Sequence, residues 1–315
     1  MRILFAGTSE IGEKVLRTLF LHHEIVGVLT QPDRPAGRHR TLQPPAIKKI
    51  LQEISPTTPL LQPENLRDLS FIAELRALQP EVMVTMAYGK ILPLEILSLP
   101  SIACLNIHAS LLPRYRGASP IQAVLAAGDS ESGITIMYMA EGLDTGDILL
   151  EKKISLDPKE TAGSLSTRLA TLAPEALLEA LTLLEKKQAP RFPQDEHLAT
   201  LTHCIERTDA LLDWTQPAIE LERKVRAMNP KPGAHGVLAL PSGKQISLKI
   251  FSSTAIPQEA LPTEALSKKP GSLFKTSDQI LLLLCGNGAL NLHEVQPEGR
   301  SRMNFSDFAR GQIRD

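Results

Sequence analysis

The chain has 315 residues, of which 43% are hydrophobic and 22% are charged, and its 34 Lys and Arg side chains nearly balance 35 Asp and Glu side chains. This composition is ordinary for a globular protein, and it excludes a disordered, fibrous or strongly basic chain. The length exceeds what one hydrophobic core usually supports, so we expect two domains.

The apolar runs are short throughout, far below the roughly 20 residues that a membrane span requires. The chain starts with a strand-like segment at residues 2–5 and lacks the pattern of a signal peptide, so we expect a cytoplasmic protein with no membrane contact. The cysteines, Cys104, Cys204 and Cys285, are far apart and form no C-x-x-C pair. We therefore expect three buried free thiols rather than disulfides or a zinc site.

The first half alternates short apolar runs with helical patterns. The expected strands are residues 2–5, 25–29, 82–86, 104–108 and 134–139, and the expected helical segments are 9–22, 46–54, 66–78, 94–97 and 121–127. This alternation predicts an α/β domain with an open, doubly wound, mostly parallel sheet of the Rossmann-like kind.

The pattern changes after a polar stretch, residues 188–195, that is interrupted by prolines and suits a connector. One helix is expected at residues 218–228, followed by short strands at 237–240, 245–251, 280–285 and 290–295. Such spacing indicates a small antiparallel barrel or sandwich. We predict a first domain of residues 1–188, a linker of residues 189–206 and a smaller β-rich domain of residues 207–315.

Polar side chains at strand ends are the first candidates for chemistry, because sites in open α/β sheets form outside the carboxyl ends of strands. Asn106 and His108 end one predicted strand and face the same side of it, and Asp144 lies in a glycine-flanked turn after another. Taken singly, each is more often structural: a strand-end histidine is usually a satisfied core residue, and an aspartate between glycines usually forms a turn.

The segment from Ser110 to Gly117 changes this interpretation. Pro113 and Gly117 break regular structure and predict a rigid loop with exposed backbone amides next to His108. Asn106-Ile107-His108, this Ser-Leu-Leu-Pro loop and the segment 142–147 together resemble the folate-dependent formyltransferases, in which Asn, His, the loop and a distant Asp occur in this order. The resemblance extends nearly end to end, because residues 213–214, 221–230 and 292–299 are similar to the tRNA-binding, OB-like barrel domain of that family.

The expected reaction gives each of the three residues a physical role. An amine that attacks a formyl carbon must lose a proton, while the formyl oxygen gains negative charge that suitably placed donors stabilise. Asn106 is expected to donate its amide hydrogen to that oxygen, and protonated His108 to donate a second one. Asp144 is expected to favour the charged form of His108 and to help remove the amine proton. These steps require neither a metal nor a covalent nucleophile.

The resemblance implies 10-formyltetrahydrofolate as the formyl donor, bound by the loop residues Ser110, Leu111, Leu112 and Pro113. A second segment, residues 86–92, is also expected to contact the donor, chiefly through Tyr88 and Gly89. Its structural alternative is a strand end followed by a glycine turn.

The acceptor has to be inferred from the rest of the chain. Residues 31–45 form a long, proline-rich loop of the kind that carries function. In and after this loop, Asp33 is outnumbered by the positive residues Arg34, Arg38, Arg40, Lys48 and Lys49. Such an excess suits phosphate contacts, although a solvated loop is the ordinary alternative.

Residues 31–38 are similar to the insertion loop of those family members that act on methionyl-tRNA. We therefore expect methionyl initiator tRNA as the acceptor, contacted by Arg38, Arg34 and Arg40, and a monomeric protein. The basic residues of the helix at 218–228 are as consistent with a solvated face as with RNA contact.

Alternative functions account for parts of the same sequence pattern. A formyltransferase acting on nucleotide-linked amino sugars would use the same three residues, whereas enzymes acting on glycinamide ribotide typically end after the first domain. A dinucleotide-dependent oxidoreductase is disfavoured because residues 7–12 lack the G-x-G-x-x-G spacing. A non-catalytic RNA-binding protein would leave Asn106, His108 and Asp144 without a purpose.

Overall fold

The computed structural model describes residues 1–36, 41–240 and 243–312, and the chain divides into two compact units. Unit 1 consists of Met1–Pro120, Glu131–Ser155 and Ser166–His203, and unit 2 consists of Ile121–Ser130, Leu156–Leu165 and the residues from Cys204 onward. Two short segments that precede α6 or begin it therefore belong to the second unit, although residues of unit 1 follow them in the chain. The domain limits at residues 188 and 207 stay a prediction.

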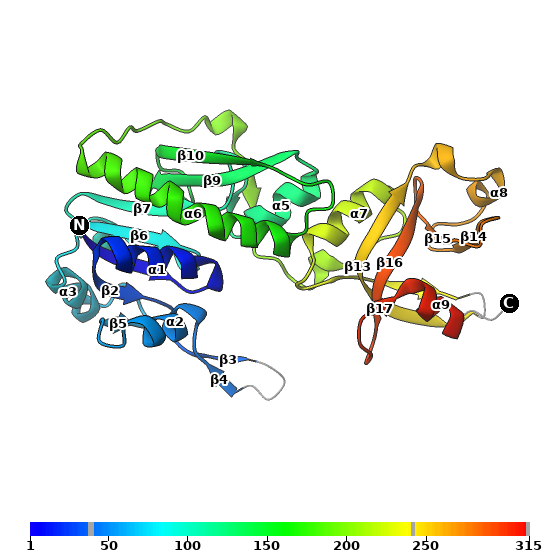
Figure 1. Ribbon diagram of the computed structural model, residues 1–315, viewed down its shortest axis with the longest axis horizontal. Coiled ribbons are helices and arrows are strands. Elements are labelled where there is room, and N and C mark those ends of the chain that lie inside the picture. The colour runs from blue at the N-terminus through cyan, green and yellow to red at the C-terminus, as the bar shows by residue number, and fades with distance from the viewer. Residues whose placement is uncertain (37–40, 241–242, 313–315) are drawn as a thin grey trace. The chain divides into compact units, whose positions relative to one another are not determined.

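Unit 1 is built on a seven-stranded sheet (Figure 1) with the order β10-β9-β7-β6-β1-β2-β5. Five strands run parallel, and their bounds are β1 Arg2–Gly7, β2 Glu24–Leu29, β5 Leu60–Leu61, β6 Val82–Met86 and β7 Ala103–His108. The last two strands at one side of the sheet, β9 (Glu131–Tyr138) and the edge strand β10 (Ile148–Ser155), are antiparallel to their neighbours. The predicted open, mostly parallel α/β sheet is confirmed, and β10 is a strand that the sequence pattern did not reveal.

The helices of unit 1 pack against this sheet because each has an apolar stripe. In α1 (Glu13–His22) the buried residues Val15, Leu16 and Leu19 recur at helical spacing. The long helix α6 (Ala162–Glu185) runs near α1 in Figure 1, and the Lys14 ammonium donates a hydrogen bond to Thr171 at 2.8 Å. The remaining helices of this unit are α2 (Ala46–Ile54), α3 (Leu69–Ala77) and α4 (Leu94–Leu97), whereas α5 (Pro120–Ala127) belongs to unit 2 except for its first residue.

Unit 2 contains an antiparallel sheet with the order β12-β13-β16-β15-β14, and β17 (Met303–Asn304) pairs with β16. The strands are β12 Ala234–Ala239, β13 Gln245–Ile256, β14 Leu273–Lys275, β15 Leu281–Leu284 and β16 Ala289–Pro297. Register shifts in β13 between Ile250 and Ser253 bend this long strand, so the sheet can curl around the helix α7 (Ala218–Ala227). The predicted small β-rich domain is confirmed. The C-terminal helix α9 (Phe305–Gln312) was not predicted.

The three cysteines do not behave alike. Cys104 and Cys285 are buried, and burial raises the pKa of each thiol to about 12, so both act as apolar filler. Cys204 is exposed, and the prediction that it is buried was wrong. It follows the polar connecting stretch, where no periodic apolar pattern supports burial.

None of the helices in the described part of the chain combines the length and the apolar character that crossing a bilayer requires.

Candidate active site

The end of β7 carries the first two predicted catalytic residues. Asn106 pairs in register with Thr85 of the neighbouring strand β6, and the Thr85 hydroxyl donates a 2.8 Å hydrogen bond to Asn106 Oδ1. This contact fixes the orientation of the Asn106 amide, because its oxygen is occupied. The Nδ2 group, which carries both amide hydrogens, is then free of Thr85 and can donate hydrogen bonds elsewhere in the site.

Asp144 reaches the same place from the turn between β9 and β10. Its carboxylate accepts hydrogen bonds from Asn106 Nδ2 at 3.2 Å and from the backbone amide of Gly117 at 2.8 Å, and its Oδ2 lies 3.5 Å from His108 Nδ1. Asp144 has a φ of +52°, a left-handed backbone conformation that side-chain-bearing residues adopt at a cost. The structure thus brings together the three residues that the sequence selected.

The imidazole of His108 is held on both sides. Its Nε2 lies 2.9 Å from the backbone carbonyl of Tyr115, which can only accept, so Nε2 must carry a hydrogen. Its Nδ1 faces the Asp144 carboxylate. Both ring nitrogens therefore face acceptors within the protein. His108 is only 5% exposed, so water does not compete strongly for these contacts.

The Ser110–Pro113 loop is rigid because its polar groups are satisfied within the protein. The Ser110 hydroxyl donates to the carbonyl of Arg114 at 2.8 Å, and Ser110 O accepts from the Thr135 hydroxyl at 2.7 Å. The backbone amide of Leu112 donates to the same Thr135 oxygen at 3.1 Å. Leu112 is buried, whereas Leu111 and Pro113 are partly exposed. The loop can therefore offer a ligand its apolar edge more readily than the Ser110 hydroxyl.

The segment after β6 presents its backbone rather than the Tyr88 side chain. Tyr88 is 4% exposed and packs in the core of unit 1, where burial raises its pKa to about 12. Its carbonyl accepts from the Thr8 hydroxyl at 2.7 Å and from Gln31 Nε2 at 2.9 Å. Ala87 and Gly89 are exposed beside the carboxyl end of β6. A bound donor would thus meet the backbone at 87–89, with Tyr88 as its support.

Comparison with known proteins places this geometry in a family. The formyl transferase family model matches residues 1–181, and the model of the formyl transferase C-terminal domain matches residues 204–312. A methionyl-tRNA formyltransferase from Akkermansia muciniphila is 42% identical over 311 residues, which cover 99% of this chain and 96% of the relative. The chain belongs to the formyl transferase family.

Solved structures share the fold at low sequence identity. An N-formyltransferase from Helicobacter canadensis, in complex with folinic acid and dTDP-3-aminofucose, has a TM-score of 0.64 at 14% identity, covering 94% of this chain and 99% of that one. HypX from Aquifex aeolicus in complex with tetrahydrofolic acid has a TM-score of 0.62 at 20% identity, covering 100% of this chain and 48% of that one. The architecture of this formyl transferase is therefore shared with proteins that diverge widely in sequence.

The predicted tRNA-binding loop of this formyl transferase contains a hairpin that the sequence did not predict. Strands β3 (Arg34–Ala36) and β4 (Thr41–Gln43) pair antiparallel. Arg34 is exposed and forms a 3.5 Å ion pair with Glu64. Arg38 and Arg40, the other two predicted contacts, lie outside the described residues.

The base of this hairpin is anchored by Asp33. Its carboxylate accepts from the Lys48 ammonium at 2.9 Å and from Gln62 Nε2 at 2.9 Å. These two hydrogen bonds hold the pKa of Asp33 below its ordinary value, and the bond from Lys48 contributes most. Lys48 thus neutralises the acid within the predicted basic patch and is engaged in structure.

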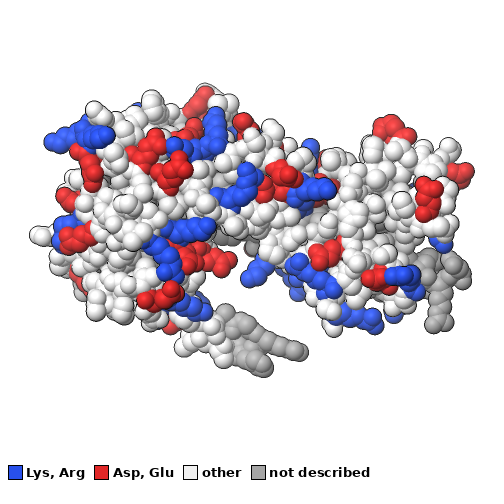
Figure 2. Space-filling model, in the orientation of Figure 1, with Lys and Arg blue, Asp and Glu red and all other residues white. Residues whose placement is uncertain are grey.

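The basic residues of α7 also make structural contacts, here within unit 2. Arg223 donates to the carbonyl of Ala127 at 3.3 Å, and Lys224 donates to that of Leu211 at 2.7 Å. Arg226 is paired with Glu222 on the same helix. On the face shown in Figure 2, Lys and Arg side chains are interspersed with Asp and Glu side chains. The contacts of the basic residues in α7 are therefore structural, and we assign no RNA contact to any of them.

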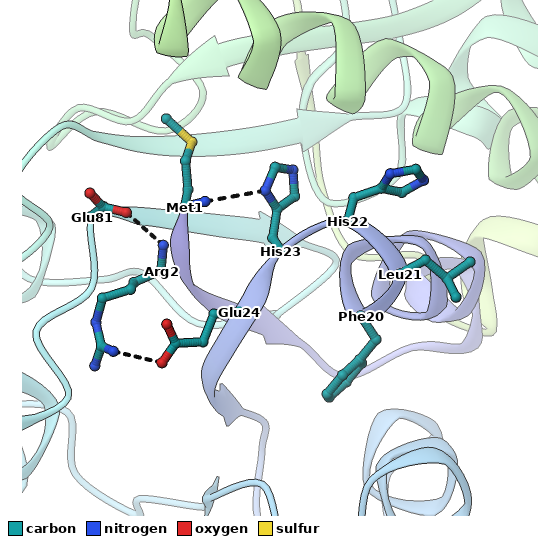
Figure 3. A pocket seen from close by; sticks show the side chains of 8 residues that line it. All are labelled: Met1, Arg2, Phe20, Leu21, His22, His23, Glu24 and Glu81. Atoms are coloured by element: carbon teal, nitrogen blue, oxygen red, sulfur yellow. Dashed lines mark hydrogen bonds and ion pairs between the residues drawn. The ribbon is translucent and has the colours of Figure 1, made fainter.

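A cavity of about 480 Å³ lies at the opposite end of the strands from the candidate active site, where β1 begins and α1 ends (Figure 3). The Met1 amino group lies 3.5 Å from His23 Nδ1, and Arg2 Nη1 pairs with Glu24 at 2.6 Å. Burial lowers the pKa of His23. Ligands of open α/β sheets bind at the carboxyl ends of strands, so this cavity at the amino ends is separate from the candidate active site.

Sequence reasoning missed several partners of the three residues. Thr85 orients Asn106, the backbone of Gly117 binds Asp144, and the carbonyl of Tyr115 binds His108. Thr85 is the last residue but one of β6, the strand next to β7, and that position was the signal that could have revealed it. Within residues 1–36, 41–240 and 243–312, no group of three or more His, Cys, Asp or Glu side chains is placed to hold a metal ion.

Proposed function

We propose that this protein transfers the formyl group of 10-formyltetrahydrofolate to the α-amino group of methionyl initiator tRNA, giving N-formylmethionyl-tRNA for translation initiation in the cytoplasm. The observation that carries the proposal is the 42% identity, over 99% of the chain, to a relative named methionyl-tRNA formyltransferase. The convergence of Asn106, His108 and Asp144 supports the same chemistry.

The catalytic roles follow from the positions of the donors. When bound, 10-formyltetrahydrofolate supplies the formyl carbon that the amine attacks. Asn106 Nδ2, with its oxygen occupied by Thr85, has a second hydrogen to donate to the formyl oxygen as that oxygen gains negative charge. Both ring nitrogens of His108 already face acceptors in the protein. Protonated His108 is therefore proposed to provide a positive field at the formyl oxygen instead of the second hydrogen bond expected from the sequence.

Asp144 balances this charge and helps to move the proton. The new bond joins the amine nitrogen to the formyl carbon, the bond from that carbon to N10 of the folate breaks, and the proton lost by the amine ends on N10. The Asp144 carboxylate, which lies within reach of both Asn106 and His108, acts as the relay for that proton. No covalent intermediate with the protein is needed.

The donor is expected to lie between two segments that flank the end of β7. Leu111 and Pro113 offer apolar edges, and the exposed backbone at Ala87 and Gly89 offers hydrogen-bonding groups. Ser110, Leu112 and Tyr88 support this surface from behind, because their side chains are buried. A flat heterocycle with polar edges, such as a pterin, fits a site of this composition.

The acceptor is expected to use a different surface. Arg34 of the hairpin is proposed to contact tRNA phosphates, which position a nucleic acid without reading its sequence. The same role is proposed for Arg38 and Arg40, which lie outside the described residues. We propose residues 1–188 as the catalytic domain and residues 207–315 as the tRNA-binding domain, with residues 189–206 as the connecting segment. The protein is proposed to act as a monomer.

An amino-sugar nucleotide is the rival acceptor. A solved formyltransferase with that type of ligand shares this fold, although at only 14% identity. The catalytic residues would serve either acceptor. The two functions can therefore be distinguished only by offering both acceptors to the protein.

The test is a competition assay with purified protein and labelled 10-formyltetrahydrofolate. Methionyl initiator tRNA and uridine-diphosphate amino-arabinose are supplied together, and the label is followed into each. We expect label in the tRNA. Label in the sugar alone would retain the chemistry but overturn the acceptor, and no transfer to either would overturn the enzymatic assignment.

A further inference from the structure

Residues 191–202 were predicted to lie in a linker, yet they contact both segments that hold the catalytic residues. The primary amide of Gln194 is the centre of these contacts. Its Nε2 donates to the carbonyl of Asp144 at 2.8 Å and to that of Gly146 at 2.7 Å, and its Oε1 accepts from Arg116 Nε at 3.0 Å. One amide therefore uses both its hydrogens and its oxygen to connect the Asp144 turn with the loop that follows Ser110.

The residues just before Gln194 hold the far side of the Asp144 turn. Phe192 and Ile148 exchange two backbone hydrogen bonds of 2.8 and 2.9 Å. The Arg191 guanidinium stacks 3.5 Å from the centre of the Tyr138 ring and lies 3.5 Å from Asp147. The turn is thus attached to this segment on both sides of Asp144.

The residues after Gln194 hold the loop that carries the partners of His108 and Asp144. Glu196 binds the buried Arg116 guanidinium through two hydrogen bonds of 2.9 and 2.7 Å. Thr200 accepts from the backbone amides of Tyr115 and Arg116, at 2.8 and 2.9 Å. The strand β11 (Leu201–Thr202) then pairs with β8 (Arg116–Gly117).

Gly117 shows how closely this segment is fitted to the site. Its amide donates to Asp144, while its φ of +113° turns the backbone against Thr202. A Cβ atom at this position would lie 2.2 Å from Thr202 O, so only glycine fits between the two.

We propose that residues 191–202 form a clamp that positions Asp144 and His108 for formyl transfer, with Gln194 as its main positioning residue. The clamp does not touch the reacting atoms. It fixes the carbonyl of Asp144, whose left-handed backbone would otherwise relax, and it fixes the loop whose Tyr115 carbonyl holds His108. This proposal rests on the proposed function, because the effect of the clamp is measured as the rate of formyl transfer.

The first experiment measures steady-state formyl transfer by Gln194→Ala. Misplacing a catalytic group by a fraction of an ångström costs rate rather than substrate binding, so we expect kcat to fall about tenfold and both KM values to stay within about twofold. Gln194→Glu keeps the shape and the acceptor for Arg116 but loses both donors, so it should lose a similar factor even where the alanine variant folds poorly. Gln188→Ala, an exposed glutamine shortly before the clamp, is the matched control and should equal the wild type.

A double-mutant cycle separates positioning from a general structural role. If Gln194 acts through Asp144, then Gln194→Ala should cost about twofold or less in an Asp144→Asn background, against about tenfold in the wild type. Equal costs in both backgrounds, or an unchanged kcat in Gln194→Ala and Gln194→Glu, would overturn the clamp. Absence of transfer by the wild-type protein would instead overturn the proposed function, so the two failures are distinct.

Discussion

The end of β7 and the β3–β4 hairpin belong to the same unit but are built in opposite ways. At the end of β7, Asn106 is bound by Thr85, His108 lies against Asp144, and Asp144 is bound by Gly117, so each residue has a partner more than 20 positions away in the chain. In the hairpin, all three residues of β4 are exposed, and the Arg34 guanidinium forms a solvent-exposed ion pair with Glu64. Under the proposed function, the chemistry would depend on fixed donors, whereas the capture of a large acceptor would depend on accessible charge.

The largest effect is expected where the fixed groups are removed. His108→Ala and Asp144→Ala should each lower kcat by about 10²–10³-fold, the usual result of removing a group that stabilises developing charge or transfers a proton. The KM for tRNA should change by about twofold at most. Steady-state kinetics with varied methionyl-tRNA measures both values, and a KM change as large as the kcat change would contradict the assignment.

A smaller effect is expected from the group that orients Asn106. Thr85→Val removes the hydroxyl that donates to Asn106 Oδ1 and keeps the shape of the side chain. Loss of one such hydrogen bond is worth about 1 kcal/mol, so we expect kcat to fall roughly five- to tenfold.

The matched control for this variant is Thr30→Val. Thr30 is also fully buried, but its hydroxyl has no hydrogen-bond partner among the described residues. This variant should keep wild-type kcat. If both variants lost activity equally, the effect would come from core packing and not from the orientation of Asn106.

The hairpin is expected to affect binding alone. Arg38→Ala should raise the KM for tRNA about fivefold, reduce its salt dependence and leave kcat unchanged, because a phosphate contact contributes mainly to binding. Arg67→Ala, an exposed arginine elsewhere in the same unit, serves as the control. A lower kcat in Arg38→Ala with a normal KM would mean that Arg38 takes part in the reaction. The contrast between the end of β7 and the hairpin would then not hold.

The smallest effect concerns the anchor of the hairpin. Lys48 and Gln62 lower the pKa of Asp33 from its ordinary value of 3.8. A carboxyl group with a depressed pKa stabilises the folded form above its ordinary pKa and loses that contribution as the pH falls through the depressed value. The anchor should therefore be intact at neutral pH.

Titration of the Asp33 carboxyl by NMR checks this expectation. The midpoint should lie below 3.8 in the wild type and move up in Lys48→Met, because this variant lacks the ammonium group that contributes most to the low pKa of Asp33. A midpoint that does not move would mean that Lys48 does not hold the hairpin base.

Much of this organisation was predictable because it follows from local pattern. The alternation of strands and helices predicted the parallel sheet, and the strand-end positions of Asn106 and His108 predicted that they share one face. The roles of Gly117 and Gln194 were not predictable in this way. Their contacts join residues that lie 27 and about 50 positions from Asp144 in the chain, and no local periodicity reports such pairs.

The hairpin and the clamp were missed for a similar reason. Prolines in residues 31–45 and 188–195 indicated irregular structure, and proline does suit loops and connectors. Such segments still form backbone hydrogen bonds when a partner strand edge is near, as β11 does with β8. Composition therefore predicted the absence of long elements but not the contacts that these segments make.

The most direct test of the division between chemistry and capture is equilibrium binding of methionyl initiator tRNA to the wild type, His108→Ala and Arg38→Ala. We expect a wild-type Kd for His108→Ala and a Kd raised about fivefold for Arg38→Ala. Equal losses of affinity in the two variants would contradict this division.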